Sequence, residues 1–375
     1  MALADTQLRK SRSGHHSLWG RAWVRLRRNR PAAISALFLG LMTLSCGFGP
    51  FLAPHAFDRI YQDYVRMPAS LTGYPSAEQI RSTAERALSR GRVAVDQLAI
   101  SGDEVSVSVR SNREIDPRIA EYLDRTDLFA HSTLTSQSAD RQTGVLRADL
   151  VRITFPFGTD GNGRDLLSRT LVAGRVSLAV GLLATLVAVL IGLTYGAVAG
   201  YVGGRVDLLM MRAVDVLYAL PFIFFVILLG VFFGRNFVLI FVAVGAIEWL
   251  DMARIVRGQT LSLKRQEYVQ AAKALGVDRI GTIRRHIVPN LLGPVAIYVT
   301  LLVPRVILLE SFLSFLGLGI NEPLTSWGAL IADGALNMQS APWMLLFPSL
   351  FLTATLFALN FLGDGLRDAL DPRDR

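Results

Sequence analysis

Long runs without a charged side chain constrain this chain more than any other feature. Residues 176–204 contain 29 consecutive positions without Asp, Glu, Lys or Arg, and residues 31–57 contain 27. An α-helix rises about 1.5 Å per residue, so about 20 apolar residues cross the hydrocarbon core of a bilayer. The whole chain is 51% hydrophobic and only 18% charged. This pattern excludes a soluble enzyme for most of the chain, and it excludes intrinsic disorder.

The apolar segments predict an all-α integral membrane protein with six transmembrane helices. The fourth segment is the shortest, with 15 residues that include Glu248, and the fifth is interrupted only by Arg305. A further apolar stretch, Ser311–Ile320, has ten residues and is too short to span, so we expect a re-entrant or interfacial piece. The six expected spans are residues 31–57, 176–204, 216–234, 236–250, 287–309 and 342–362.

Basic residues near the ends of the spans predict the orientation of the chain. The first 30 residues contain eight Lys or Arg against one acid, and residues 251–286 contain eight against three acids. Cytoplasmic loops carry an excess of Lys and Arg, so we expect both segments and both termini in the cytoplasm. Residues 55–165, with 14 basic and 16 acidic residues, then form a long external loop. A cleaved signal peptide explains the first span less well, because its apolar core is too long and no A-x-A site follows it.

The external loop contains secondary-structure signals of its own. A helix is predicted over residues 76–90, because Ser76 and Gln79 have the spacing of a capping box. Two runs of alternating apolar and polar residues flank the turn Ser101–Glu104, which predicts a β-hairpin. A second short helix, opened by proline, is predicted over Pro117–Asp124. We therefore expect a small inserted α+β module.

The sequence contains no motif for nucleotide binding, metal binding or nucleophilic catalysis. None of its three lysines follows a glycine-rich phosphate-binding loop, and its single cysteine, Cys46, excludes an internal disulfide. If this protein uses ATP, another chain binds the nucleotide. Residues 160–165 begin like a calcium loop, but Leu171 occupies the position of the required bidentate Glu. We expect no metal site there, but a turn that leads into a short helix at the membrane edge.

Four glycines recur at intervals of four residues in the second span: Gly192, Gly196, Gly200 and Gly204. Residues four apart lie on one face of a helix, where the missing side chains let a second helix approach closely. The pattern predicts helix packing. It leaves open whether the neighbouring helix belongs to this chain or to another subunit.

Residues 262–289 are the most informative segment and predict a cytoplasmic helix–turn–helix. An apolar stripe with i, i+3/4, i+7 spacing is followed by Gly276, where the C-cap of a helix prefers glycine. The stripe consists of Tyr268, Ala271 or Ala272, and Leu275. Such a hairpin either lies on anionic lipid or docks into a groove of another protein. The small Ala-Ala pair favours docking, since lipid insertion favours Trp, Phe and Leu.

A second short helix is expected after Gly276, with Asp278 as its N-cap. Its apolar face is expected to contain Ile280, Ile283 and Ile287. The opposite face is basic and contains Arg279, Arg284 and Arg285.

This segment resembles the EAA loop of ATP-binding-cassette importer permeases. Its residues Gln270-Ala271-Ala272-x-x-x-Gly276, then nine residues, then His286-Ile287-Val288-Pro289, match the family pattern E-A-A-x-x-x-G-x9-I-x-L-P with three departures. Gln270 replaces Glu, His286 replaces Ile and Val288 replaces Leu. In that family the loop is the coupling helix that sits in a cleft of the ATPase subunit. The resemblance implies this role for Gln270, Ala271, Ala272, Gly276, Ile283, Arg285 and Pro289.

The similarity extends well beyond the loop and fades only over about residues 66–151. Four further segments resemble the C-type permease subunit of oligopeptide importers: residues 157–165, 249–262, 310–319 and 360–375. The resemblance implies the six-helix type I importer fold in a bacterial inner membrane. It implies a second permease subunit, two ATPase subunits that bind ATP and Mg, and a periplasmic solute-binding protein as partners. The chain itself is then expected to contact lipid but no nucleic acid, to bind no cofactor and to catalyse no bond chemistry.

These expectations define a domain organisation. A basic cytoplasmic tail precedes the first transmembrane helix, and a periplasmic module separates that helix from the permease domain, which contains the hairpin 262–289. The expected boundaries are residues 1–30 for the tail, 31–54 for the first helix, 55–170 for the module, 171–364 for the permease domain and 365–375 for the C-terminal tail.

Three ionisable residues in or near the spans leave an alternative function open. Glu248, Arg305 and Glu310 would form a proton relay in an ion-coupled secondary transporter or channel. A structural role, or a place on the translocation path for Arg305, is the simpler interpretation, because that residue alone lies toward the middle of a span. A structural or sensory membrane protein is the third hypothesis. Transport assays with and without ATP, an ion gradient and the partner subunits separate the three.

Overall fold

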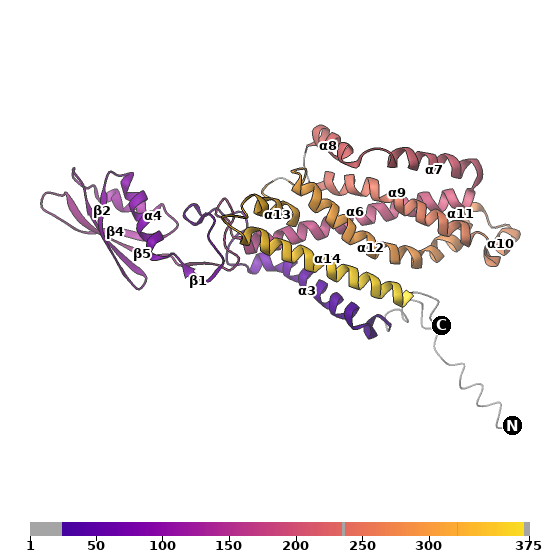
Figure 1. Cartoon of the computed structure of the whole chain (residues 1–375), viewed down its shortest axis with the longest axis horizontal. Coiled ribbons are helices and arrows are strands. Elements are labelled where there is room, and N and C mark those ends of the chain that lie inside the picture. The colour runs from indigo at the N-terminus through magenta and orange to yellow at the C-terminus, as the bar shows by residue number, and fades with distance from the viewer. Residues whose placement is uncertain (1–24, 235–236, 321, 371–375) are drawn as a thin grey trace, which may run out of the picture. The chain divides into compact units, whose positions relative to one another are not determined.

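The computed structural model describes residues 25–234, 237–320 and 322–370 (Figure 1). Most of the predicted basic tail, residues 1–24, lies outside the described residues. The chain divides into two compact units. The first, which we call the helical unit, comprises residues 1–47, 174–329 and 350–375; the second, the sheet unit, comprises residues 48–173 and 330–349.

Long apolar helices form most of the helical unit. The helices α3, α6, α13 and α14 continue from it into the sheet unit. The helices are α3 (Arg30–Leu52), α6 (Leu166–Val202), α7 (Gly204–Tyr218), α8 (Phe222–Phe233), α9 (Phe237–Leu263), α10 (Glu267–Ala274), α11 (Arg279–Thr282), α12 (Val288–Phe315), α13 (Trp327–Leu336) and α14 (Trp343–Leu370).

Among the described residues, four helical segments are long and apolar enough to cross a membrane. They agree with the first, second, fifth and sixth predicted spans. The four segments are Arg30–Leu52, Leu166–Val202, Arg279–Phe315 and Trp343–Ala369.

The third and fourth predicted spans differ from the expectation. The third is not one helix, because α7 and α8 meet at a bend of 79° around Pro221. Proline removes a backbone donor and clashes with the preceding turn, so a helix cannot pass straight through this position. If the bent pair counts as one span, the number rises to five. The fourth segment begins α9, which is 27 residues long but carries four charged residues between Glu248 and Arg257.

Two other predicted pieces belong to longer helices. The stretch Ser311–Ile320 is not a separate re-entrant segment, because α12 continues through Phe315 before a glycine turn ends it. Gly317 has a φ of 75°, and the amides of Gly317 and Leu318 donate to the carbonyls of Ser314 and Leu313. The short membrane-edge helix expected before the second span is likewise the first part of α6.

Glycine and small side chains bring the helices of the helical unit into direct contact. A Cβ built at Gly365 of α14 would clash with Ala32 of α3, and one built at Gly363 would lie 3.0 Å from Thr300 Oγ1 of α12. A Cβ at Gly181 of α6 would lie 2.6 Å from Ile307 of α12. The helix α12 therefore contacts both α6 and α14. Its buried side chains join those of α6 and α9 in one apolar core.

The sheet unit contains a four-stranded antiparallel sheet with the strand order β2-β3-β5-β4. The strands β1 and β6 form a separate antiparallel pair. The strands are β1 (Ser70–Tyr74), β2 (Ala94–Ser101), β3 (Glu104–Arg110), β4 (Phe129–Gln137), β5 (Thr143–Leu150) and β6 (Ile153–Phe155). The helical elements that lie wholly within its described residues are α4 (Ala77–Ser89), α5 (Glu121–Asp124) and two 3₁₀ turns, Gln62–Tyr64 and Pro117–Ala120.

One face of the sheet is covered by α4, as Figure 1 shows. Val107 of β3 pairs with Leu146 of β5, and both are fully buried, so alternate side chains of the two strands form one apolar surface. Ala84 and Leu88 of α4 are fully buried in the same cluster.

The local signals in this segment were sufficient to predict several elements. The capping box is confirmed, because Gln79 N donates to Ser76 Oγ and the Gln79 side chain accepts from Ser76 N. The hairpin is confirmed as β2 and β3, joined at Ser101 and Glu104. The helical segment at Pro117–Asp124 is confirmed as a 3₁₀ turn that leads into α5. The strands β4 and β5 were not predicted.

The loop at residues 160–165 is a turn closed by charge and hydrogen bonds. The Asp160 carboxylate accepts from the backbone amides of Asn162 and Arg164 at 2.8 and 2.9 Å. The same carboxylate pairs with the side chains of Arg164, at 2.8 Å, and Arg169, at 3.3 Å. The charge of the Asp160 carboxylate is therefore already balanced by the two arginines. Among the described residues, no group of three or more acidic, His or Cys side chains is arranged to hold a metal ion.

Candidate functional site

The predicted helix–turn–helix is built around a glycine turn. The amide of Gly276 donates to Lys273 O and the amide of Val277 donates to Ala272 O, both at 3.1 Å. This pair of hydrogen bonds is the Schellman motif, which needs a left-handed residue after the helix. Gly276 supplies it with a φ of 83°. The turn therefore ends α10 at a fixed position and fixes the direction of the following chain.

The second arm of the hairpin is the beginning of a long helix. Asp278 Oδ1 accepts from Gly281 N at 3.2 Å and caps α11, as expected from its position. A π-helical turn, Ile283–Ile287, joins α11 to α12 without a break, so the helical segment runs from Arg279 to Phe315. This corrects the expectation of a second short helix.

The two faces of α10 differ in exposure. Val269 is fully buried and Ala272 is 6% exposed, so both face the core of their own chain. Tyr268 and Leu275 are 42% and 85% exposed, and Ala271 is exposed between them. The outward apolar stripe therefore passes through Ala271. Ala272, which was expected on the docking face, instead supports the hairpin from the inside.

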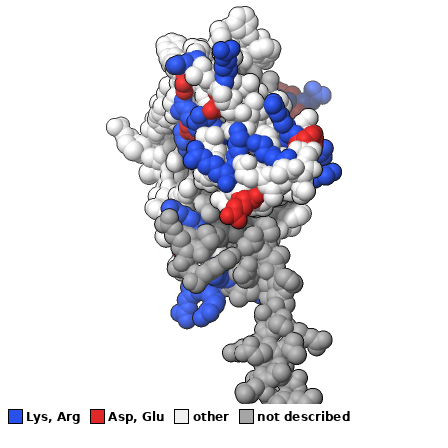
Figure 2. All heavy atoms as spheres, turned by 90° about the vertical axis from the view of Figure 1, so that its right-hand side faces the viewer, with Lys and Arg blue, Asp and Glu red and all other residues white. Residues whose placement is uncertain are grey.

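The remaining predicted residues of the hairpin surround this stripe. Gln270 is exposed, and its Nε2 donates to Lys264 O at 2.7 Å, which ties α10 to the end of α9. Arg285 and Pro289 are exposed, and Ile283 is half-buried. Ile280 is 67% exposed, so only the deeper part of the second apolar face is covered. Figure 2 shows Lys and Arg side chains gathered on the face that carries the hairpin; the exposed ones of the hairpin are Arg265, Lys273, Arg279, Arg284 and Arg285.

Three of the four predicted glycines contact α9. A Cβ at Gly192 would lie 2.6 Å from Met252 Cβ, one at Gly196 would lie 2.8 Å from Val256 Cβ, and one at Gly200 would lie 2.8 Å from Thr260 Cβ. The three contacts fall at intervals of four residues on both helices, so α6 and α9 pack along parallel ridges. The partner of the glycine face is thus a helix of the same chain.

Gly204 does not belong to this face, although its spacing predicted that it would. It begins α7 with a φ of 61°, and a Cβ built on it would meet nothing within 4 Å. Its glycine is required by the turn between α6 and α7, where Gly203 also has a positive φ of 72°.

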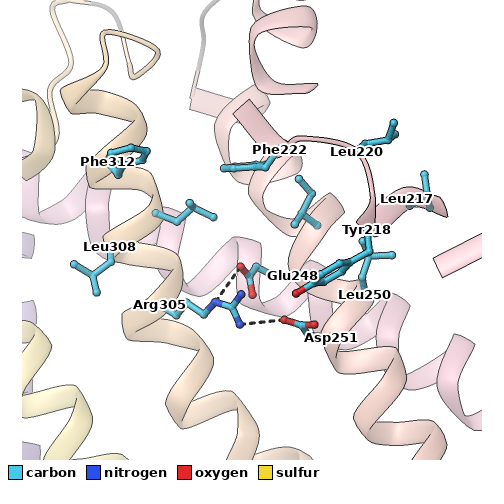
Figure 3. Close-up of a pocket in the computed structure, with 12 residues that line it drawn as sticks. Leu217, Tyr218, Leu220, Phe222, Glu248, Leu250, Asp251, Arg305, Leu308 and Phe312 are labelled. Atoms are coloured by element: carbon cyan, nitrogen blue, oxygen red, sulfur yellow. Dashed lines mark hydrogen bonds and ion pairs between the residues drawn. The ribbon is translucent and has the colours of Figure 1, made fainter. Parts of the chain in front are cut away.

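Arg305 lies beside a pocket of about 520 Å³ between α9, α12 and the α7–α8 bend (Figure 3). Its Nη1 lies 3.0 Å from Asp251 Oδ2, and its Nε lies 3.5 Å from Glu248 Oε1. Glu248 is 2% exposed, whereas half of the Arg305 side chain is accessible. The rest of the lining is mainly apolar, with Leu308 and Phe312 contributed by α12.

The third ionisable residue is held in a different environment. Glu310 is fully buried, and its carboxylate accepts from Ser177 Oγ at 3.1 Å and from Ser314 Oγ at 2.7 Å. Arg305 is instead paired with Glu248 and Asp251. The contacts of the described residues therefore place the three groups of the hypothetical relay in two separate clusters.

Two family descriptions match the sequence. "Binding-protein-dependent transport system inner membrane component" matches residues 192–375, and "N-terminal TM domain of oligopeptide transport permease C" matches residues 17–69. The oligopeptide transport system permease protein OppC of Escherichia coli (strain K12) is 65% identical over 219 residues, which are 58% of this chain and 72% of that protein. The chain belongs to this family of inner-membrane transport components.

A second relative supports the same assignment. The dipeptide transport system permease protein DppC of Bacillus subtilis (strain 168) is 50% identical over 238 residues, which are 62% of this chain and 74% of that protein. As a permease component, the chain is a multi-pass inner-membrane protein and is not itself an enzyme. Neither family description covers residues 70–191, so the four-stranded sheet lies outside both.

Several charged residues that link helices of the helical unit were not predicted from the sequence. Asp251 lies three residues after Glu248 on α9, and this i, i+3 spacing could have indicated that both acids face Arg305. Asp207 of α7 binds the Arg257 guanidinium of α9 through both carboxylate oxygens, at 2.5 and 2.6 Å. No local pattern links these two positions, which are 50 residues apart.

Proposed function

We propose that this chain is one of the two permease subunits of an ATP-driven importer that moves oligopeptides across the cytoplasmic membrane. The proposal rests on family membership and on the names of the relatives that the chain covers over most of their length. The other parts of the assembly are a second permease, two ATPase subunits that bind ATP and Mg, and a periplasmic solute-binding protein. Peptide passes between the two permeases.

The observation that carries the coupling role is the exposed apolar stripe on the hairpin. Tyr268, Ala271, Leu275 and Ile280 are all exposed and present apolar surface to the outside. Exposed apolar groups surrounded by charge mark a protein-binding surface. We infer that this stripe enters a groove of the ATPase, as the helix-in-groove mode of recognition requires.

The predicted coupling residues have different roles in this proposal. Gln270, Ala271 and Arg285 contact the ATPase, because all three are exposed. Gly276 and Ala272 hold the shape of the hairpin. Half-buried Ile283 and exposed Pro289 lie at the π-helical turn and at the beginning of α12, where the hairpin continues into a transmembrane helix.

The hairpin is well placed to transmit movement into the membrane. It connects the end of α9 with the beginning of α12, and these two helices also contact each other through Arg305 and its two acids. A displacement of the hairpin by the ATPase therefore moves two packed helices together, as a rigid body. We propose that Arg305 lies on the translocation path, because its side chain borders the pocket between these helices.

The proposed topology has six spans, with the bent pair α7–α8 as the third and the first part of α9 as the fourth. Both termini and the hairpin are cytoplasmic, and residues 55–170 are periplasmic. A reporter that is active only in the periplasm should give a signal when fused near Gly102 and none near Lys264 or after Arg375. A signal at Lys264 would contradict the count of six.

The function is tested by reconstitution. The permease pair and the ATPases are co-purified into vesicles, peptide-loaded binding protein is added, and uptake is measured for peptides of increasing length. ATP-dependent uptake of oligopeptides supports the proposal. Uptake by this chain alone that depends on an ion gradient and not on ATP would establish the ion-coupled transporter instead.

A further inference from the structure

Most arginines in the middle part of the sheet unit form ion pairs, and most of the others lie together. Twelve arginines lie between Arg66 and Arg152, and seven of them form ion pairs. The pairs are Arg81–Glu85, Arg86–Asp63, Arg110–Asp96, Arg125–Glu121, Arg141–Glu114, Arg147–Glu104 and Arg152–Asp103. On this surface an arginine is therefore usually accompanied by an acid.

Four of the five remaining arginines line the same pocket. The guanidinium groups of Arg90, Arg92, Arg113 and Arg118 form no ion pair or hydrogen bond within the described part of the chain. Together with the paired Arg110 and Arg125, they make six arginines against three acids in the pocket lining. Mutual repulsion between unpaired cations opposes such a gathering, and a bound anion relieves it.

The pocket is a defined part of the fold. It has a volume of about 860 Å³ and lies where the end of α4, the beginning of β2, the end of β3 and the Pro117–Ala120 turn meet. Val93, Ile115 and Ile119 are each at most 5% exposed and belong to the core beneath it. The residues that line the pocket are therefore held in place by the packed core of the sheet unit.

A strained residue lies within the pocket wall. Arg92 has a φ of 60°, in the left-handed region that side chains other than glycine rarely adopt. Its conformation is held by two hydrogen bonds, from Arg92 N to Ser89 O and from Ser111 Oγ to Arg92 O. Strained residues that the surrounding structure maintains are concentrated at binding sites.

We propose that this pocket binds a soluble oxyanion with two or more negative charges, such as a polycarboxylate or a phosphate compound. Guanidinium groups present planar forks of N–H donors that match carboxylate and phosphate oxygens. The volume lies in the range of pockets for small organic ligands and exceeds the needs of a single phosphate ion. The side chains of Asn112 and Tyr122 add neutral hydrogen-bonding groups to the lining.

The charge distribution favours a soluble anion over an anionic lipid headgroup as the occupant of this pocket. Residues 55–165 as a whole carry 14 basic and 16 acidic residues, so the segment has no general attraction for a negatively charged membrane. Its positive charge is concentrated in one concave site. An acidic segment of another protein is the competing occupant, and the experiment includes it.

The test uses the full chain in nanodiscs of zwitterionic lipid, with pyrophosphate and citrate as probes. Binding is measured by isothermal titration calorimetry at two salt concentrations. The variants are Arg90→Gln, Arg113→Gln, Arg118→Gln and their combination, together with Arg118→Lys, which keeps the charge and loses the fork. Arg147→Gln is the matched control, because Arg147 lies on β5 outside the pocket and is paired with Glu104.

We expect a measurable affinity for at least one probe, weaker at high salt, and about a tenfold loss for each single Gln variant. Arg118→Lys should fall between wild type and Arg118→Gln, and Arg147→Gln should bind like wild type. Circular dichroism confirms that each variant is folded.

Three results would overturn the proposal. The first is no binding of either probe at millimolar concentration, and the second is equal binding by the triple variant and Arg147→Gln. The third is binding that appears only with nanodiscs containing phosphatidylglycerol or only with an acidic peptide, which would assign the pocket to a lipid headgroup or to a protein partner. None of these results depends on transport activity.

Discussion

Arg305 of α12 donates to Asp251 of α9 at 3.0 Å, and this contact joins the helix that leads into the hairpin 262–289 to the helix that follows it. Asp251 lies 12 residues before the end of α9 at Leu263, and Arg305 lies 17 residues after the beginning of α12 at Val288. The ion pair therefore connects the helices at a distance of several turns from the hairpin. In the proposed mechanism, this ion pair makes the two helices move together when the hairpin is displaced.

The first prediction concerns this pair. Arg305→Met should leave Glu248 buried without its cation and lower the stability of the solubilised chain by about 1–2 kcal/mol. This is less than the 3–5 kcal/mol that is typical of breaking a fully buried pair, because half of the Arg305 side chain is accessible. Thermal unfolding in detergent measures the loss. In the assembled importer, ATP hydrolysis should continue while peptide uptake falls.

A double substitution controls for the loss of charge balance. Adding Glu248→Gln to Arg305→Met removes the unpaired buried charge and should restore much of the stability, but not the transport, if the contact between α9 and α12 is what matters. Equal transport by the wild type and the single variant would show that the pair does not contribute to coupling.

The second prediction separates two neighbouring alanines of the hairpin. Ala271→Glu adds an exposed charge to the apolar stripe, so the chain should keep its stability and lose binding to the ATPase. Ala272 is 6% exposed, so Ala272→Glu buries an unpaired carboxylate and should destabilise the hairpin itself. Co-purification with the ATPase and thermal unfolding measure the two effects. The proposed docking face is incorrect if Ala271→Glu still binds the ATPase with wild-type affinity.

Much of the membrane architecture could be predicted because charge-free runs report on the bilayer directly. The four long candidate spans and the capped turn at Gly276 follow from local pattern alone. The break at Pro221 was also visible in the sequence, but the uninterrupted apolar run around it favoured a straight helix. The hydropathy of a segment does not distinguish a span from two helices at an angle.

The arrangement of the ionisable residues could not be predicted to the same degree. Glu248 and Arg305 were recognised individually, but their pairing depends on how α9 packs against α12, which is set by contacts between distant residues. For the same reason, the spacing of Gly192, Gly196 and Gly200 predicted a packing face without its partner. Gly204 fits that spacing by coincidence, because the α6 helix ends before it.

The third prediction tests the glycine face. Gly196→Val should force α6 away from α9, because a Cβ at this position would lie 2.8 Å from Val256 Cβ and even closer to the carbonyl oxygen of Ala253. Overpacking of this kind costs about 1–3 kcal/mol, measurable as a lower unfolding temperature. Gly258→Ala is the control, since a Cβ at Gly258 of α9 would meet nothing within 4 Å and alanine favours the helix. Equal destabilisation by the two substitutions would contradict the packing of α6 on α9.

The last prediction concerns the pH dependence of the sheet unit. Burial lowers the pKa of His55 below its usual value of 6.5, and the nearby Asp165 only partly offsets this effect. Its ring lies 5.0 Å from that of Phe155, and its Nδ1 is buried without a hydrogen-bond partner in the structure. The folded state therefore binds fewer protons than the unfolded state, and stability is lost as the pH falls from about 6.5 through the lowered pKa. His55→Phe should remove this acid sensitivity, whereas His131→Asn, at an exposed histidine of β4, should keep it. Hydrogen exchange of the sheet unit at pH 5 and pH 7.5 measures the difference. An identical pH response in wild type and His55→Phe would show that another group is responsible.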